Sequence, residues 1–110
     1  MAMNNTYALS EPPREEIDAL SGPALVEFGA PWCGFCRAAQ EPLAAALEHY
    51  PGVRHIKIED GKGRRLGRSF TVKLWPTLVF LNDGKEVARL VRPGDAQVIR
   101  QALAQIDTTR

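Results

Sequence analysis

The sequence predicts a three-layer α/β/α fold, in which helices cover both faces of a mixed central sheet. Three observations predict it. Short apolar runs alternate with helical stretches over the first two thirds of the chain, which is the order of a parallel sheet with crossover helices. The turn signal Asn82-Asp83-Gly84 joins the next two strands as an antiparallel hairpin. A final amphipathic stretch supplies a covering helix. We expect residues 1–110 to form a single domain.

Composition places the chain among ordinary globular proteins. Apolar residues make up 45% of the chain and charged residues 25%. Fourteen Lys plus Arg against thirteen Asp plus Glu leave a net charge of +1, which argues against nucleic-acid binding. No apolar run approaches the roughly 20 residues of a membrane helix, and the first ten residues show no secretion signal. We therefore expect a cytoplasmic monomer with neither membrane nor nucleic-acid partners.

The first predicted elements are a short edge strand, a helix and a buried strand. Residues 6–9 are expected to form the edge strand. A helix then begins with Ser10 as its N-cap, because prolines and glutamates suit its first turn, and it ends at Gly22. Residues 24–28 are short and apolar, as in a buried strand, with Glu27 as the exception.

The second helix is predicted over residues 33–50. Pro42 is expected to kink this helix, and the Pro-Gly pair after it to end it. Residues 53–59 alternate as a strand with Ile56 and Ile58 inward. A basic loop with a short helix from Arg64 follows, and we expect its basic residues to be solvated; the alternative is a surface for an acidic partner. The apolar face of the second helix consists of Ala39, Leu43, Ala46, Leu47 and Tyr50.

The last elements are the hairpin and its covering helix. Residues 77–81 form a strongly apolar strand, and residues 86–91 return as its partner. Asp95 is positioned to cap the final helix. The apolar face of that helix consists of Val98, Ile99, Ala102, Leu103 and Ile106.

Cys33 and Cys36 are the feature that points to a function. Two cysteines are too few for a disulfide-stapled secreted scaffold. Cys33 is expected at a helix N-terminus, where free N–H groups and the helix dipole lower the pKa of a thiol below its usual value of ~8.5. Cys36 lies one turn further on nearly the same face and can bond to the first sulfur. Such a pair exchanges two electrons with a substrate disulfide, with Cys33 as the nucleophile and Cys36 as the resolving thiol.

Three other interpretations of this pair remain open. The cysteines could be half of a zinc site, but only His49 and His55 remain as ligands and neither fits a finger spacing. They could form a structural disulfide, although so short a ring adds little stability. They could be two unrelated buried thiols. The strand before them and the helix after them favour redox chemistry without a metal or a cofactor.

The run FGAPWCGFCR (residues 28–37), together with Trp75-Pro76-Thr77 and the Asn82-Asp83-Gly84 turn, resembles the thioredoxin family. The resemblance covers about residues 7–106. It implies the thioredoxin fold and a thiol–disulfide oxidoreductase that mainly reduces protein disulfides and is recycled by an NADPH-dependent flavoprotein reductase. Two alternatives are a glutathione-linked or oxidising thiol-exchange protein, and a partner-binding module with little turnover.

The resemblance also implies roles for individual residues. The family's buried acid falls at Glu27, a Glu in place of the usual Asp, and would accept the Cys36 proton unless it is solvated at a sheet edge. Pro76 matches the family's cis-proline, which presents the backbone of Trp75 to an extended substrate; the alternative is an ordinary trans proline. Trp32 is expected either at the rim of the site, in contact with substrate, or in the core.

Four positions depart from the family's usual pattern. Phe35 replaces a proline, so we expect a reduction potential less negative than that of thioredoxins. Trp75 replaces a smaller residue and Gly29 a frequent tryptophan, so the Trp75 ring either forms an apolar platform with Phe35 or fills the gap at Gly29. Arg92 replaces a glycine and either favours carboxylate-bearing substrates, glutathione mixed disulfides included, or is a solvated loop residue. The residues expected to bind substrate are Trp32, Gly34, Phe35, Trp75, Pro76 and Arg92.

Overall fold

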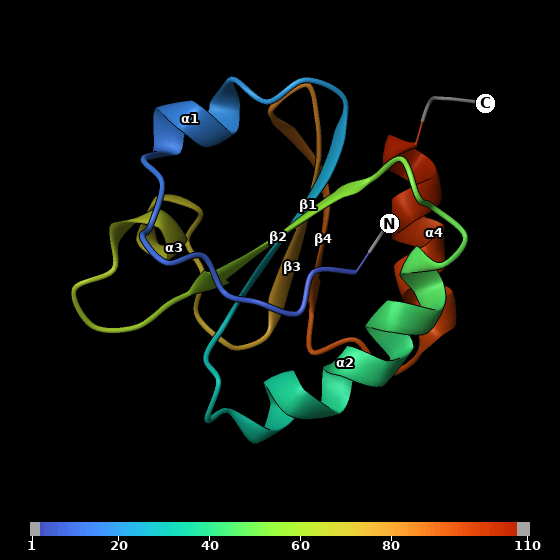
Figure 1. Ribbon diagram of the computed structural model, residues 1–110, viewed down its shortest axis with the longest axis horizontal. Coiled ribbons are helices and arrows are strands. Elements are labelled where there is room, and N and C mark those ends of the chain that lie inside the picture. Colours follow the sequence, from blue (N-terminus) through green and yellow to red (C-terminus); the bar gives the residue numbers. More distant parts are fainter. Residues whose placement is uncertain (1–2, 108–110) are drawn as a thin grey trace.

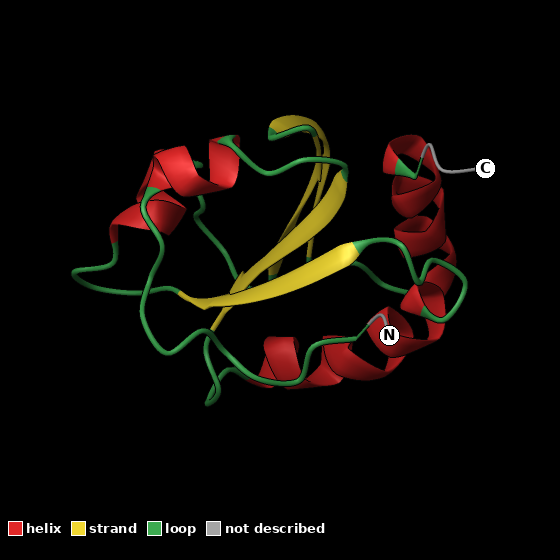
Figure 2. Cartoon of the chain, turned by 45° about the horizontal axis from the view of Figure 1, so that its top comes forward, coloured by secondary structure: helices red, strands yellow, loops and turns green. Residues whose placement is uncertain are grey.

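A four-stranded sheet lies between two layers of helices in the computed structural model, which describes residues 3–107 (Figures 1 and 2). The strand order is β2-β1-β3-β4, with β2 parallel to β1 and the other neighbours antiparallel. This mixed sheet confirms the predicted fold class. The elements in chain order are α1 (Arg14–Asp18), β1 (Pro23–Gly29), α2 (Gly34–Leu47), β2 (Arg54–Glu59), α3 (Arg65–Ser69), β3 (Thr77–Asn82), β4 (Lys85–Val91) and α4 (Ala96–Ile106).

Only β1 and β2 form the expected parallel pair with a crossover helix. The third strand, β3, runs antiparallel to β1. The sequence order suggested another crossover, but α3 has five residues. At 1.5 Å per residue such a helix spans only about 7.5 Å, against roughly 20 Å for a strand of six residues. The chain therefore enters β3 from the end of the sheet where β1 and β2 finish.

The N-terminal segment differs from the prediction in two ways. Tyr7 forms an isolated bridge to Lys57 in place of a full edge strand. The first helix begins at Arg14, with Pro13 as an N-cap that makes no side-chain cap bond, so the predicted cap at Ser10 is wrong. The reason is that a residue before proline is driven out of the helical region, which keeps the chain extended up to Pro13. The helix also ends early, at Asp18.

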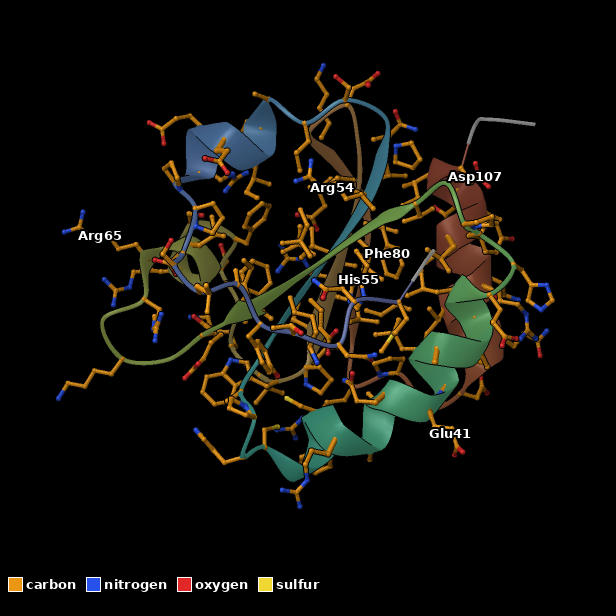
Figure 3. The ribbon with its side chains drawn as sticks, in the orientation of Figure 1. Glu41, Arg54, His55, Arg65, Phe80 and Asp107 are labelled. Atoms are coloured by element: carbon orange, nitrogen blue, oxygen red, sulfur yellow. The ribbon has the colours of Figure 1, made fainter. Side chains whose placement is uncertain are left out.

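Two apolar layers fill the space on either side of the sheet. The helices α2 and α4 cover one face, and α1 and α3 cover the other (Figure 1). The predicted inward faces of α2 and α4 are confirmed, except that Tyr50 and Val98 are only half-buried. Phe80, labelled in Figure 3, belongs to the layer between the sheet and helices α2 and α4. The largest fully buried side chains of the layer formed with α1 and α3 are Ile17, Phe28, Ile58, Leu66 and Leu81.

Strand β2 is buried on both faces, which the alternation of its apolar residues did not indicate. Ile56 and Ile58 pack in the layer under α1 and α3, as predicted. The alternate residues His55 and Lys57 are also buried, at 7% and 6% exposure. They lie on the α2 face because successive strand residues point to opposite faces. This places polar side chains beneath the redox motif.

The β3–β4 hairpin is tied back to the start of β1. Asp83 and Gly84 have φ values of +50° and +78°, the positive pair that a two-residue turn of type I′ requires. The Asp83 carboxylate accepts a hydrogen bond from the N–H of Gly22 at 2.8 Å. The predicted turn is therefore confirmed.

Within residues 3–107, no helix has the length and apolar character that crossing a membrane requires.

Asp95 caps α4 as predicted, since its Oδ1 accepts the N–H of Val98 at 3.1 Å. We expect Asp95→Ala to lower the free energy of unfolding by about 1 kcal/mol, because the first turn loses a partner for one of its free N–H groups. Urea unfolding measures the change. Asp95→Asn is the matched control and retains the stability, because an amide oxygen accepts the same bond. Equal stability of Asp95→Ala and the unsubstituted protein would contradict the prediction.

Candidate active site

The two cysteines lie where β1 leads into α2. Cys33 is the N-cap of α2, and its Sγ accepts the backbone N–H of Cys36 at 3.2 Å. Both side chains are free thiols, and they are 7% and 2% exposed. The N-terminus of a helix stabilises negative charge through its unpaired N–H groups and its dipole. The geometry therefore places the Cys33 sulfur at the start of the helix, with Cys36 one turn behind it.

The Cys36 thiol holds its proton tightly. The pKa of Cys36 is raised to about 12, first by burial and then by the hydrogen bond with Cys33, against a backbone hydrogen bond with Ala30 that lowers it. At neutral pH this thiol is protonated. It can become a nucleophile only when a nearby group takes the proton.

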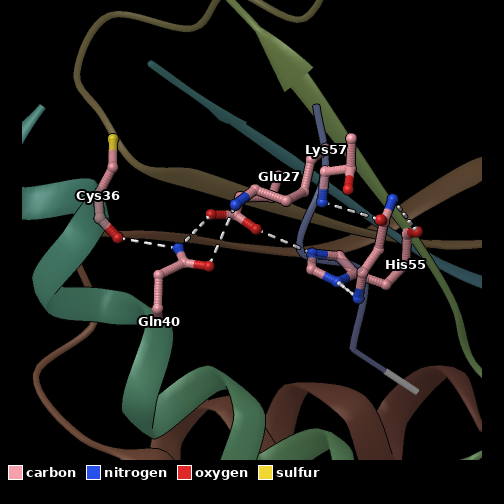
Figure 4. A network of polar contacts seen from close by, with 7 residues as sticks. Glu27, Cys36, Gln40, His55 and Lys57 are labelled. Carbon is pink, nitrogen blue, oxygen red and sulfur yellow. Dashed lines mark hydrogen bonds and ion pairs between the residues drawn. The ribbon is translucent and has the colours of Figure 1, made fainter. Parts of the chain in front are cut away.

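A buried carboxylate lies behind Cys36, at the centre of β1. Glu27 is 0% exposed, which excludes the solvated-edge alternative. Figure 4 shows its two oxygens facing Gln40 and His55. Gln40 Nε2 donates to Glu27 Oε2 at 2.8 Å and to the carbonyl oxygen of Cys36 at 2.9 Å. Gln40 Oε1 accepts from Lys57 Nζ at 3.2 Å. Glu27 thus belongs to a hydrogen-bonded network that reaches the backbone of the resolving cysteine, and its surroundings are not purely apolar.

The orientation of His55 within this network follows from its neighbours. The backbone N–H of Asn4 donates to Nδ1 of His55 at 2.9 Å, so Nδ1 is an acceptor. The hydrogen of the ring then lies on Nε2, which is 2.8 Å from Glu27 Oε1. Both ring nitrogens are therefore occupied, and His55 is not available as the zinc ligand that one interpretation of the sequence required.

Sequence reasoning missed Gln40, His55 and Lys57 as parts of the site. A signal for two of them was present, because a strand with Ile56 and Ile58 on one face must turn His55 and Lys57 to the other. In the parallel register, Lys57 lies beside Glu27. No local pattern identified Gln40, because its role depends on how α2 crosses β1.

Gly29 leaves room for the Cys36 sulfur. A Cβ atom at this position would lie 2.6 Å from Cys36 Sγ and 3.4 Å from the hydroxyl of Tyr7. The space beside Gly29 is therefore occupied by Tyr7 and Cys36, and the suggestion that Trp75 fills it is wrong. A cavity of about 250 Å³ opens here, lined by Tyr7, Cys36, Gln40 and Lys57 among others. Burial raises the pKa of Tyr7, so its hydroxyl stays protonated beside the dithiol.

Aromatic side chains form the rim of the site. Trp32 and Phe35 are 68% and 59% exposed, which excludes a core position for Trp32. Trp75 packs against the cluster of Ala30, Cys33 and Cys36 and meets Trp32 edge-on, with ring centroids 5.4 Å apart. Its indole N–H donates to Asp60 Oδ2 at 3.0 Å. The aromatic partner of Trp75 is thus Trp32, and the expected platform with Phe35 gives way to a Trp32–Trp75 pair.

The remaining expected site residues lie beside this rim. The Trp75–Pro76 peptide bond is cis, as the resemblance implied. Gly34 is exposed at the first position of α2. Arg92 is exposed but not free: its Nε donates to the carbonyl oxygen of Trp75 at 2.8 Å, and its guanidinium lies 3.9 Å from the centroid of the Phe35 ring. The structure therefore brings every expected substrate-binding residue to one end of the sheet.

Comparisons with known proteins agree with this geometry. The family model described as Thioredoxin matches residues 10–105. The reduced form of thioredoxin 2 from Pseudomonas aeruginosa PAO1 is 59% identical, with a TM-score of 0.84 over 94% of this chain and 96% of that one. Thioredoxin Asp f 28 from Aspergillus fumigatus is 28% identical over 106 residues, which cover 96% of this chain and 98% of the relative. A thioredoxin from Chlamydia trachomatis is 37% identical over 71 residues, 64% of this chain and 70% of its own.

Proposed function

We propose that this chain, which belongs to the thioredoxin family of thiol–disulfide oxidoreductases, acts mainly as a reductase of protein disulfides. The observation that carries the proposal is the position of Cys33 as the N-cap of α2, with the N–H of Cys36 directed at its sulfur. A sulfur held in this way is suited to attack, and its partner one turn away is suited to displace the product.

The proposed reaction has two exchange steps. The Cys33 thiolate attacks one sulfur of the substrate disulfide, forms a mixed disulfide and releases the other substrate sulfur as a thiolate. Cys36, once deprotonated, then attacks the sulfur of Cys33 and releases the second substrate thiolate. The substrate gains two electrons, and Cys33 and Cys36 lose them as they form a disulfide. An external reductant restores the dithiol, and we propose an NADPH-dependent flavoprotein reductase for this step.

Glu27 is the proposed acceptor of the Cys36 proton. Two of the influences that raise the pKa of Cys36 come from Cys33, through its hydrogen bond and its charge. Both disappear when Cys33 carries no charge in a mixed disulfide, so the Cys36 thiol becomes easier to deprotonate at the step that needs it. Gln40 and His55 hold the Glu27 carboxylate in place through hydrogen bonds to each of its oxygens. The proton taken up by the acid can then pass to the departing thiolate.

Reduction of insulin by dithiothreitol tests the proposed reductase activity. We expect the protein to shorten the lag before the reduced insulin chains precipitate, because dithiol exchange is faster than direct attack by dithiothreitol. A partner-binding module with silent cysteines would leave the lag unchanged. Faster oxidation of a reduced, unfolded protein than reduction of insulin would instead favour the oxidising alternative.

A further inference from the structure

Arg92 links the two segments that border the dithiol. It directly follows β4, and its backbone N–H donates to the carbonyl oxygen of Pro76 at 3.0 Å. Its φ of +51° lies in the left-handed region, which a side chain other than glycine seldom adopts. The backbone is thus turned so that the side chain reaches across from β4 toward the redox motif.

The Arg92 side chain is held at two points. Its Nε donates to the carbonyl oxygen of Trp75, and its guanidinium covers Phe35, the residue directly before Cys36. Phe35 is itself exposed, so the stack lies at the surface where a substrate would approach. A hollow of about 160 Å³ adjoins it, bordered by Phe35, Pro42, Arg92 and Pro93 among others.

The charge of Arg92 has no acidic partner within residues 3–107. The ion pairs in this part of the chain join Arg14 to Asp18, Arg64 to Glu59 and Arg89 to Glu86. Since the Arg92 side chain donates among these residues only from Nε, its terminal amino groups have no partner there, on a guanidinium whose position is already set. An arginine fixed in this way loses little conformational entropy when it binds, and its planar fork matches a carboxylate.

We propose that Arg92 forms a carboxylate-binding subsite, so that among disulfide substrates the protein prefers those with a carboxylate next to the sulfur that Cys33 attacks. The carboxylate can belong to an acidic side chain of a peptide or to a glutathionyl group. This inference rests on the proposed function, because it selects among the substrates of that reaction. It assigns Arg92 to substrate specificity, and the exchange chemistry itself stays with the cysteines.

The test compares two peptide disulfides that differ only in one residue beside the half-cystine, Glu in one and Gln in the other. Pre-reduced protein is mixed with each, and the second-order rate constants are compared under single-turnover conditions. We expect the Glu peptide to react about two- to fivefold faster, which is the effect of an exposed charge pair. The preference should shrink as salt concentration rises. Arg92→Gln should bring the ratio of the two rate constants to one.

Two further variants keep this test decisive. Arg92→Gly removes the side chain and suits the positive φ, so its ratio should also be one; a ratio within one protein does not depend on the folded fraction. Arg37→Gln is the matched control, because it removes an exposed arginine from α2, the helix that carries Phe35 and Cys36. It should leave the ratio of the two rate constants unchanged. Equal rates for both peptides in the unsubstituted protein, or an equal loss of preference in Arg37→Gln, would overturn the proposal.

A third substrate identifies the source of the carboxylate. The Gln peptide, made with a C-terminal amide and joined to glutathione, carries only the glutathionyl carboxylates. A slower reaction of this mixed disulfide in Arg92→Gln would show that the subsite also accepts glutathione; an unchanged rate would restrict it to peptide side chains. Failure to reduce any of these disulfides would refute the proposed reductase function, whereas equal reduction of the two peptides would refute only the subsite.

Discussion

Cys33→Ser should eliminate disulfide exchange, whereas Cys36→Ser should stop after the first step with substrate bound. The difference follows from position: Cys33 is the N-cap of α2 and the proposed nucleophile, and Cys36 lies behind it, 2% exposed and protonated at neutral pH. A serine hydroxyl does not exchange with a disulfide, so each variant removes one step and leaves the surrounding shape almost intact.

Mass spectrometry of the intact protein measures this outcome. Each reduced variant is mixed with a peptide disulfide, without dithiothreitol, which would otherwise replace the resolving thiol. Cys36→Ser should gain the mass of one peptide half, and Cys33→Ser should gain none. Thermal unfolding of both variants checks that the fold is retained. Adduct formation on Cys33→Ser at the rate seen for Cys36→Ser would show that the assigned order of attack is wrong.

Glu27→Ala should slow the resolving step about a hundredfold at neutral pH, the lower end of what a positioned acid or base contributes. Burial is the first cause of the raised pKa of Cys36, and it remains in this variant. A raised thiol pKa means that the nucleophilic thiolate is scarce at neutral pH and increases as pH rises. The resolving rate of Glu27→Ala should therefore climb about tenfold per pH unit in the alkaline range, since only solvent takes the proton. The unsubstituted protein should show a much flatter profile.

An aromatic disulfide that releases a coloured thiolate separates the two steps in a stopped-flow experiment. The first release reports attack by Cys33 and should be unaffected by Glu27→Ala; the second reports attack by Cys36 and should be slow. Glu41→Ala is the matched control, because it removes an exposed carboxylate from the residue next to Gln40. Equal slowing of both releases, or a pH profile parallel to that of the unsubstituted protein, would argue that Glu27 has only a structural role.

Much of the secondary structure could be predicted from local patterns in the sequence. The apolar run of β3, the turn at Asp83 and Gly84 and the cap at Asp95 all agree with the structure. These features depend on interactions within a few residues: side-chain alternation, the turn's positive φ values and the first free N–H groups of a helix. The prediction failed at Ser10, where the restriction that proline places on the preceding residue outweighed the preference of serine for a cap.

The candidate site also contains features that local sequence predicts and features that depend on tertiary contacts. The position of Cys33 at the start of α2 followed from the sequence, because a helix that begins after a strand places its first side chain at the N–H groups. Glu27 contacts Gln40 and His55, which lie 13 and 28 positions away along the chain. Arg92 contacts Trp75, which lies 17 positions away, and the still more distant Phe35. No local pattern specifies such contacts, because they arise only when parallel register, helix crossing and the end of β4 bring distant segments together. The dithiol could therefore be predicted from its immediate neighbours along the chain, whereas the groups proposed to move its proton and to select its substrate are brought together only by tertiary packing.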